Sequence, residues 1–397
     1  MVPRFLNALM IGVWLAGCGI IPERNPDPGG DGQLAEIAGL PTSVRFWGDE
    51  APARFVEAIR ERSKDELQGL VPDLIGTQHQ YLAISGGGQN GAFGAGLLVG
   101  WSAAGTRPEF TMVTGISTGA LTAPFAFLGQ AYDDKLTQVY TTYSTDDLIS
   151  PRPWTAVATS DARADTDGLQ RVIRSFVDRQ LLEDLASAYR QGRHLYIGTT
   201  HLDARRPVIW DVTAIAANGG LDARDLVVDV LLASASIPAV FPPVIFPVER
   251  DGTSYDELHV DGGAAQQVFL YPAVVDWPAL LDKLDAVGRP QVYVIRNSRL
   301  EPEWAAVTPD VMSIATTSLS SLIRTQGLGD LNRLYLTSTR DGMDFHLAYI
   351  PNDFTAEPQE TFDPVYMRQL YDLGFKRAEA GYPWARIPPD LKVDSAQ

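Results

Sequence analysis

Residues 81–91, YLAISGGGQNG, decide the fold, because an apolar run passes there directly into a glycine-rich loop. The run Tyr81–Ser85 predicts a short buried strand, and Ala92–Ala104 predicts a helix with Ala, Leu and Trp on its buried side. A second strand is expected at Thr111–Ile116 and a second helix at Leu121–Leu128. A strand, a helix and a strand within about 35 residues predict a right-handed βαβ unit.

The rest of the chain continues this alternation of strands and helices. Further strands are predicted at Leu195–Thr200, Leu258–Val260 and Val292–Ile295, and helices at Leu169–Val177, Leu226–Ala235 and Met367–Ala380. We therefore predict an α/β fold with a mainly parallel sheet, whose ligands bind at the carboxyl ends of the strands. Without an internal repeat or a second linker, one globular domain is expected over residues 34–390.

The composition excludes several classes of protein. Of 397 residues, 32 are Lys or Arg and 49 are Asp or Glu, so the formal charge is −17. This acidic balance argues against nucleic-acid binding, and an apolar content of 45% argues against disorder. A single cysteine permits no internal disulfide, and the five histidines form no His-x-x-x-His pair, so a zinc hydrolase is not expected.

The N-terminus is typical of an exported lipoprotein. Phe5–Ala16 is a mostly apolar run, shorter than the roughly 20 residues that cross a bilayer. Leu15-Ala16-Gly17-Cys18 resembles a lipobox, which implies a signal peptide at 1–17 and a lipid anchor on Cys18; the alternative is an ordinary signal peptide with a chance cysteine. Residues 18–33 are predicted to be a flexible tether. Gly19 in place of Asp favours the outer membrane in a host with two membranes.

A G-x-S-x-G motif, Gly115-Ile116-Ser117-Thr118-Gly119, follows the second predicted strand. A sharp turn between a strand and a helix exposes a serine hydroxyl above a sheet, and glycines two residues before and after it permit close backbone approach. Ser117 is therefore a candidate nucleophile. The alternative is a purely structural turn.

The glycine loop places backbone donors before a helix. Gly86, Gly87, Gly88, Asn90 and Gly91 line a segment whose N–H groups can bind a phosphate or the oxyanion of an acyl-transfer reaction. The loop also satisfies G-x-G-x-x-G, but a dinucleotide site needs an acidic residue after the next strand. Ser117 stands there instead, and Glu109 precedes that strand.

A third motif, Leu258–Gly263, places Asp261 at the end of a short strand before Gly262 and Gly263. An isolated Asp-Gly is usually only a turn. A serine nucleophile needs a base within hydrogen-bond reach, however, and Asp261 is the candidate.

Together, the glycine loop, the G-x-S-x-G about 30 residues later and the Asp-Gly-Gly further on resemble the patatin-like phospholipases, including the bacterial lipoproteins of that family. The stretches Gly198–Asp203 and Ala233–Pro243 strengthen the resemblance, which covers residues 80–300. It implies a three-layer α/β fold and a lipid acyl hydrolase that cleaves a lipid or another ester through an acyl-serine. No cofactor or metal is expected, because the acidic pairs of the chain lack the spacing of a calcium-binding loop.

The same resemblance implies roles for individual residues. Ser117 corresponds to the nucleophile and Asp261 to its base in a Ser-Asp dyad, and the N–H groups of Gly87 and Gly88 correspond to the oxyanion hole. Asn90 departs from the family pattern, because many members carry arginine there.

Two rival readings remain open at this point. A Ser-Asp-His triad would need His346, the one histidine late enough in the chain; His259, two residues before Asp261, is interpreted as a neighbour of that residue. A lipoprotein could also keep this fold for binding alone. The acidic pairs Asp133-Asp134 and Asp146-Asp147 lack the spacing of an EF-hand and are interpreted as solvated.

Overall fold

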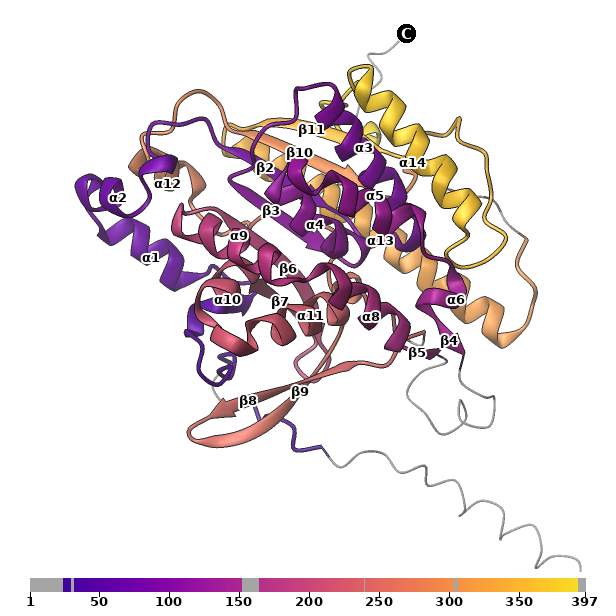
Figure 1. Ribbon diagram of the computed structural model, residues 1–397, viewed down its shortest axis with the longest axis horizontal. Helices are drawn as coiled ribbons and strands as arrows, with labels where there is room; N and C mark the ends of the chain where they lie inside the picture. Colours follow the sequence, from indigo (N-terminus) through magenta and orange to yellow (C-terminus); the bar gives the residue numbers. More distant parts are fainter. Residues whose placement is uncertain are drawn as a thin grey trace, which may run out of the picture.

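A central mixed sheet organises the protein (Figure 1). The computed structural model describes residues 24–29, 32–151, 164–238, 240–302, 304 and 306–391. The strands of this sheet are β1 Arg45–Trp47, β2 Gln80–Ile84, β3 Met112–Ile116, β6 His194–His201, β7 Arg206–Asp211, β8 Val244–Arg250, β9 Thr253–Asp261, β10 Gln291–Arg296 and β11 Asp344–Tyr349. A separate two-stranded ribbon consists of β4 Ser150–Pro151 and β5 Ala164–Asp165.

Helices cover both faces of the sheet and one of its ends (Figure 1). They are α1 Ala53–Glu61, α2 Lys64–Leu70, α3 Gly91–Ala103, α4 Thr118–Leu128, α5 Asp133–Thr141, α6 Thr145–Leu148, α8 Asp167–Phe176, α9 Arg179–Arg190, α10 Val212–Asn218, α11 Ala223–Ser234, α12 Trp277–Lys283, α13 Val311–Arg340 and α14 Pro364–Glu379. Among the described residues, no helix has both the length and the apolar composition needed to cross a membrane.

The strand order is β1-β7-β6-β3-β2-β10-β11, and β9 pairs with both β6 and β8. The five strands from β6 to β11 in this order are parallel to their neighbours, whereas β7, β1, β9 and β8 pair antiparallel. The predicted α/β class, with a mostly parallel sheet flanked by helices, is confirmed. The carboxyl ends of β2, β3 and β6 consequently lie at one edge, as the βαβ pattern predicts.

Successive side chains of the strands enter two different cores, because side chains alternate across a sheet. In β2, Leu82 and Ile84 pack in the larger core, which α3, α4, α11 and α14 complete. Tyr81 and Ala83 face the smaller core, where α13 contributes Leu331. The three layers therefore follow from strands that are apolar on both faces.

The hairpin formed by β8 and β9 is longer than the short strand predicted at Leu258–Val260. Asp251 and Gly252 join the two strands with φ values of 52° and 76°. Such left-handed pairs suit two-residue hairpin turns, in which Asp-Gly is favoured. The turn signal was present in the sequence, but the polar β9 residues near the turn do not have the pattern of a buried strand.

The N-terminal segment contacts this hairpin. Arg24 pairs with Asp203 at 2.5 Å, and Asp27 pairs with Arg250 at 2.8 Å. The prediction of a flexible tether over 18–33 therefore differs from the structure at residues 24–29, because ion pairs hold these residues against the domain. The predicted signal peptide and Cys18 lie outside the described residues.

Candidate active site

Two strand ends meet beside β6 and bring together the two predicted catalytic side chains. Ile116, the last residue of β3, is in register with Gly198 of β6, and Asp261, the last residue of β9, is in register with Thr199. Because β3 and β9 approach from opposite directions along the same flank of β6, Ser117 follows Ile116 to the position of Asp261. The Ser117 side chain thereby lies beside the Asp261 carboxyl group and acts to lower its pKa.

Ser117 occupies a strained turn between β3 and α4. Its φ and ψ are 56° and −126°, an unusual conformation for a residue other than glycine, which typically costs about 1–3 kcal/mol. A Cβ on Gly119 would lie 2.4 Å from the Ile84 carbonyl oxygen, and one on Gly115 would lie 2.5 Å from the Gly119 carbonyl oxygen. Both glycines of the motif are therefore required by close backbone packing.

Asp261 is held in a buried position next to Ser117. Both side chains are nearly inaccessible, with Ser117 6% and Asp261 5% exposed. Burial raises the pKa of Asp261 to about 6, against the opposing hydrogen bonds from Ser117 and from the Gly263 N–H group. The Gly263 N–H donates to Asp261 Oδ1 at 2.7 Å. A Cβ on Gly262 would lie 2.4 Å from the Gly198 carbonyl oxygen, so the Asp-Gly-Gly turn also needs its first glycine.

The glycine loop presents free donors beside Ser117. The Gly86 N–H donates to the Gln267 carbonyl oxygen at 3.2 Å, and a Cβ on Gly86 would lie 3.3 Å from that of Ser117. Within the described part of the chain, the N–H groups of Gly87 and Gly88 have no acceptor. Unpaired backbone N–H groups next to a nucleophile can bind an oxyanion. Gly91 packs against the residue after Ser117, since a Cβ on Gly91 would lie 2.0 Å from Thr118 Oγ1.

Asn297, which the sequence analysis did not identify, supports this loop from the end of β10. Its Nδ2 donates to the Ser85 carbonyl oxygen at 3.0 Å, and its Oδ1 accepts from the Gly94 N–H at 3.1 Å. A Cβ on Gly87 would lie 2.2 Å from the Asn297 carbonyl oxygen. The loop is thus packed tightly against β10. No local sequence pattern marks Asn297, because its partners lie about 200 residues away.

Two further residues that were missed hold the backbones of both catalytic residues. Ser234 Oγ accepts from the Ser117 N–H at 3.0 Å and donates to the Gly198 carbonyl oxygen at 2.7 Å. The Asp261 N–H donates to the Ser236 carbonyl oxygen at 2.9 Å. The end of α11 therefore fixes Ser117 and Asp261 relative to each other. The sequence did contain a sign of these residues, because Ala233–Pro243 resembles a family segment, but no role was predicted for it.

Asn90, which stands where many family members carry arginine, connects the glycine loop to α14. The Tyr366 hydroxyl donates to Asn90 Oδ1 at 2.8 Å, and the neighbouring Gln89 accepts from the Asp363 N–H at 3.0 Å. Both contacts involve the start of α14, so this helix fixes the outer side of the loop. A side-chain amide supplies here a hydrogen bond that carries no net charge.

An apolar pocket of about 50 Å³ adjoins Ser117. Its lining is largely aliphatic and aromatic, including Leu121, Ile173, Phe241 and Phe362. This volume compares with about 30 Å³ for one water molecule in the liquid. A long aliphatic chain therefore enters only if the lining side chains move apart.

His346 lies on β11 and is engaged elsewhere. Its Nε2 is 2.8 Å from Gln291 Oε1 and 2.9 Å from Arg386 Nη1. Burial, with a further contribution from Arg386, lowers the pKa of His346 to about 4. Among the described residues, no histidine forms a hydrogen bond with Ser117 or Asp261.

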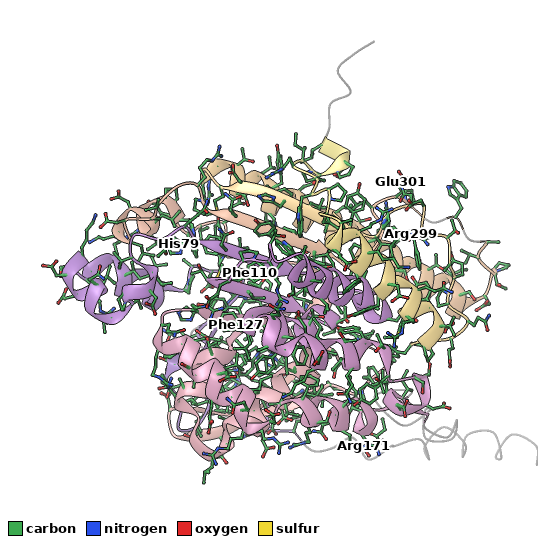
Figure 2. The ribbon with its side chains drawn as sticks, turned by 45° about the horizontal axis from the view of Figure 1, so that its top comes forward. His79, Phe110, Phe127, Arg171, Arg299 and Glu301 are labelled. Atoms are coloured by element: carbon green, nitrogen blue, oxygen red, sulfur yellow. The ribbon has the colours of Figure 1, made fainter. Side chains whose placement is uncertain are left out.

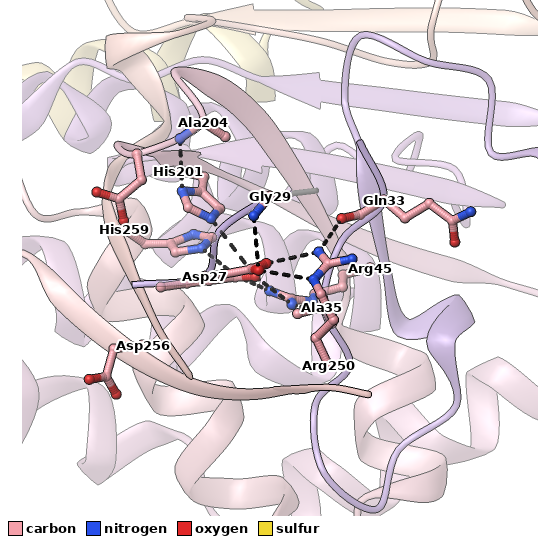
Figure 3. A network of polar contacts seen from close by, with 12 residues as sticks. Asp27, Gly29, Gln33, Ala35, Arg45, His201, Ala204, Arg250, Asp256 and His259 are labelled. Atoms are coloured by element: carbon pink, nitrogen blue, oxygen red, sulfur yellow. Dashed lines mark hydrogen bonds and ion pairs between the residues drawn. The ribbon is translucent and has the colours of Figure 1, made fainter. Parts of the chain in front are cut away.

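A buried polar network under β9 includes three groups of the types that bind metal ions (Figure 3). His201, Glu257 and His259 each offer a ligand atom within 4.8 Å of the others. Two histidines and a carboxylate can hold a divalent metal. The Glu257 carboxylate, however, already accepts two hydrogen bonds from Arg45, at 2.5 Å and 3.0 Å.

His259 is also fully engaged in this network. Its Nε2 lies 3.1 Å from Glu257 Oε2 and its Nδ1 2.9 Å from Thr199 Oγ1, which accepts from Trp210 Nε1. Burial raises the pKa of Glu257, but the His259 hydrogen bond and Arg45 outweigh it and lower the pKa to about 2. We therefore interpret the cluster as an ion-pair network that joins β1 to β9, the strand that ends at Asp261.

Comparisons with known proteins give one family match and one similar solved structure. Residues 82–274 match the family model described as Patatin-like phospholipase. Among solved structures, that of VipD from Legionella pneumophila is similar over 76% of this chain, with 11% identity and a TM-score of 0.30. The chain spans 66% of the length of VipD. A search of curated proteins found no match.

Proposed function

We propose that this chain, which carries a patatin-like phospholipase domain at residues 82–274, hydrolyses lipid esters through an acyl-serine intermediate on Ser117. Patatin-like phospholipases act on lipid esters. The observation that carries the proposal is the placement of Ser117, by the registers of β3 and β9 on β6, beside the buried Asp261 carboxyl group, whose pKa is raised to about 6. A carboxylate of raised pKa is a stronger base for a hydroxyl proton.

In the first half of the reaction, Asp261 accepts the Ser117 proton while Oγ attacks the ester carbonyl carbon. Negative charge develops on the carbonyl oxygen, where the free N–H groups of Gly87 and Gly88 receive it. When the tetrahedral intermediate collapses, Asp261 returns the proton to the leaving alcohol. The acyl group then remains on Ser117.

In the second half, a water molecule replaces the alcohol. Asp261 takes a proton from this water as it attacks the acyl-serine, and the same two N–H groups stabilise the second oxyanion. Collapse releases the carboxylic acid and returns the proton to Ser117 Oγ. The fixed backbone of both residues, through Ser234 and Ser236, keeps donor and acceptor aligned for each transfer.

The apolar pocket next to Ser117 supports an acyl chain as the group that is bound. Leu121, Ile173 and Phe241 present no charge to the substrate. Because the closed pocket is small, acyl chains of increasing length displace more side chains on entry. We propose that short acyl esters are hydrolysed without this rearrangement and that long ones require it.

We also propose that the protein is exported and anchored by lipid on Cys18, in the outer membrane if the host has two membranes. The support is the lipobox-like sequence at 15–18. Six peptide steps separate Cys18 from Arg24, whose side chain contacts Asp203, and they span at most about 21 Å. Such an anchor would keep the domain close to the lipid surface. A Cys18→Ala variant should move from the membrane to the soluble fraction and lose labelling by palmitate.

The test of the proposed chemistry combines labelling with hydrolysis assays on phospholipids and p-nitrophenyl esters. We expect a fluorophosphonate probe to label the protein at Ser117, and Ser117→Ala to abolish both labelling and turnover. Asp261→Asn should lower kcat at least about 10³-fold, because the hydroxyl loses its base. His346→Ala is the matched control and should retain turnover. Loss of turnover in His346→Ala together with its retention in Asp261→Asn would establish the rival triad.

A further inference from the structure

A large apolar cavity lies at the amino ends of the central strands. Its volume is about 580 Å³, within the range of about 300–1,000 Å³ that small-molecule sites occupy. Met112, which begins β3, lines the cavity, whereas Ser117 follows the last residue of that strand, about 15 Å further along it. Within the described residues, this cavity and the pocket at Ser117 share no lining residue.

Besides the amino ends of the central strands, the walls of the cavity come from helices that take no part in the site. Figure 1 shows α1, α2 and α12 grouped at one end of the molecule, opposite α6 and α8. In Figure 2, His79 lies at this same end, beside α1 and α2, whereas Arg171 lies far from it. Aliphatic side chains of α1 and α2, such as Val56 and Leu67, form one wall.

Aromatic rings form a second part of the wall, and the polar atoms of three of them are paired. Tyr271 stacks on Trp277 with ring centres 4.4 Å apart, and Tyr81 contacts Trp277 edge-on at 5.7 Å. Trp277 Nε1 donates to the Tyr81 hydroxyl at 3.2 Å, and the Tyr271 hydroxyl donates to Asp341 at 2.6 Å. This wall consequently offers a ligand apolar ring surface.

The charged side chains that line the cavity have partners, are exposed, as Arg62 and Arg190 are, or both. Arg333 pairs with Asp330 at 2.7 Å, and Asp49 pairs with Arg206 at 2.6 Å. The buried part of the wall therefore presents little net charge to a ligand.

Two polar side chains that line the cavity, His79 and Gln266, have buried atoms without a hydrogen-bond partner among the described residues. His79 is 1% exposed, and neither of its ring nitrogens has a hydrogen-bond partner among the described residues; Gln266 Oε1, also at the cavity, is buried and unpaired too. Burial lowers the pKa of His79 to about 4, so the ring is neutral near pH 7 and has one donor and one acceptor. Each buried polar group without a partner costs about 1–3 kcal/mol. A ligand in the cavity would remove this cost.

We infer that this cavity is a second lipid site, which binds one long aliphatic chain that carries an uncharged, hydroxylated head, as in a fatty alcohol or a monoacylglycerol. The chain packs along the aromatic wall, and the hydroxyl group forms hydrogen bonds with His79 and Gln266. This inference does not rest on ester hydrolysis at Ser117.

The unpaired atoms decide the chemistry of the head. Gln266 Oε1 accepts hydrogen bonds and donates none, so it needs a donor, which an ionised carboxylate lacks. A carboxylate would also bring a charge into an apolar cavity whose imidazole is neutral, and burying an unpaired charge is costly. An alcohol avoids both penalties, because a hydroxyl group donates to one atom and accepts from another.

The wild-type protein tests this choice through Trp277, which lines the cavity. A bromine atom quenches tryptophan fluorescence on contact, so bromoundecanol should quench saturably, to one site per chain. Bromoundecanoic acid of the same length should bind at least about tenfold more weakly at pH 8, because it lacks the donor. Trp277→Phe should remove the quenched component and so place the ligand in this cavity.

Two substitutions in the cavity test the roles of its walls. His79→Phe keeps a ring but removes both nitrogens, and it should weaken binding of bromoundecanol about tenfold, the equivalent of one hydrogen bond. Val56→Trp narrows the cavity and should weaken binding. Both variants should retain fluorophosphonate labelling of Ser117, which shows that the domain is folded.

Three results would overturn the inference: no saturable quenching in the wild-type protein, equal affinity for the acid and the alcohol, or unchanged binding in a folded Val56→Trp variant. Because none of these readouts depends on turnover, a protein that fails to hydrolyse any ester can still confirm the second site.

Discussion

The two ends of the central sheet differ in how tightly they are packed. At the carboxyl ends, space is scarce: the pocket at Ser117 measures about 50 Å³, glycines stand where no Cβ fits, and the polar groups hold one another. At the amino ends, beside a cavity of about 580 Å³, the buried His79 has no hydrogen-bond partner among the described residues. The difference teaches that a reactive group is positioned by crowding, whereas a ligand is accommodated by space and by unpaired polar atoms.

The largest expected effect concerns the crowding at the carboxyl ends. Gly87→Ala should lower kcat about 10²–10³-fold, because the new Cβ would lie 2.2 Å from the Asn297 carbonyl oxygen and displace an oxyanion donor. Gly105→Ala is the control, since its Cβ meets nothing within 4 Å and its φ is likewise positive. Steady-state kinetics on a soluble ester measures both. Equal losses in the two variants would show that strain, and not donor position, governs the rate.

The next effect concerns the cost of burying Asp261. The pKa of the Asp261 carboxyl group is raised from 3.8 to about 6 in the folded protein, so the folded state binds this proton more tightly than the unfolded state. The resulting contribution to the free energy of unfolding is complete below pH 3.8 and is lost as the pH rises through 6. Asp261→Asn removes this loss, so its free energy of unfolding at pH 8 should exceed that of the wild type by about 2–3 kcal/mol.

The same titration sets the pH dependence of activity. For the wild type, kcat/KM should fall about tenfold per pH unit below pH 6, because only the ionised carboxylate accepts the Ser117 proton. Denaturant unfolding at pH 4 and pH 8 tests the stability prediction, and at pH 4 the advantage of Asp261→Asn should be small. An activity profile that is flat from pH 4 to pH 8 would show that Asp261 is not the base.

A smaller effect is expected at the end of α11. Ser234→Ala leaves the Ser117 N–H without its acceptor and should lower kcat about tenfold, with little change in KM. Ser236→Ala is the matched control, because its hydroxyl donates to the Leu232 carbonyl oxygen and touches neither catalytic residue. If both variants lose activity equally, Ser234 stabilises the helix and does not position Ser117.

The smallest effect concerns the amino ends. His79→Phe removes two unpaired nitrogens from an apolar cavity and should raise the free energy of unfolding by about 1 kcal/mol. Tyr81→Phe is its counterpart, because Tyr81 has a partner in Trp277, and it should lower stability slightly. A His79→Phe variant that is less stable than the wild type would reveal a partner for the imidazole within the protein.

Local pattern was sufficient for the elements that carry the motifs. The strand before the glycine loop was predicted at Tyr81–Ser85 and lies at Gln80–Ile84, because a short apolar run between turn signals has few alternatives. The β8–β9 hairpin was not predicted beyond Leu258–Val260. Its outer half is largely polar and pairs with a neighbouring strand and the N-terminal segment, which no local period reveals.

The candidate site divides in the same way. Ser117, Asp261 and the glycines are short motifs at strand ends, so the residue types and the expected turn predict their chemistry. No local sequence motif marks the roles of Asn297, Ser234 and His79. Their importance comes from atoms far away along the chain, such as the Ser85 carbonyl oxygen that Asn297 contacts.

The sequence by itself determined the α/β class, the strand-loop-helix at residues 81–91 and which hydroxyl and which carboxyl group are candidates for catalysis, because these depend on neighbours within a few residues. Only the tertiary structure decided that β3 and β9 end beside Thr199 of β6, that the N-terminal segment lies on the hairpin, and that a cavity remains at the opposite end. The physical reason is that register, packing and voids arise from contacts between distant segments, which a linear pattern does not record.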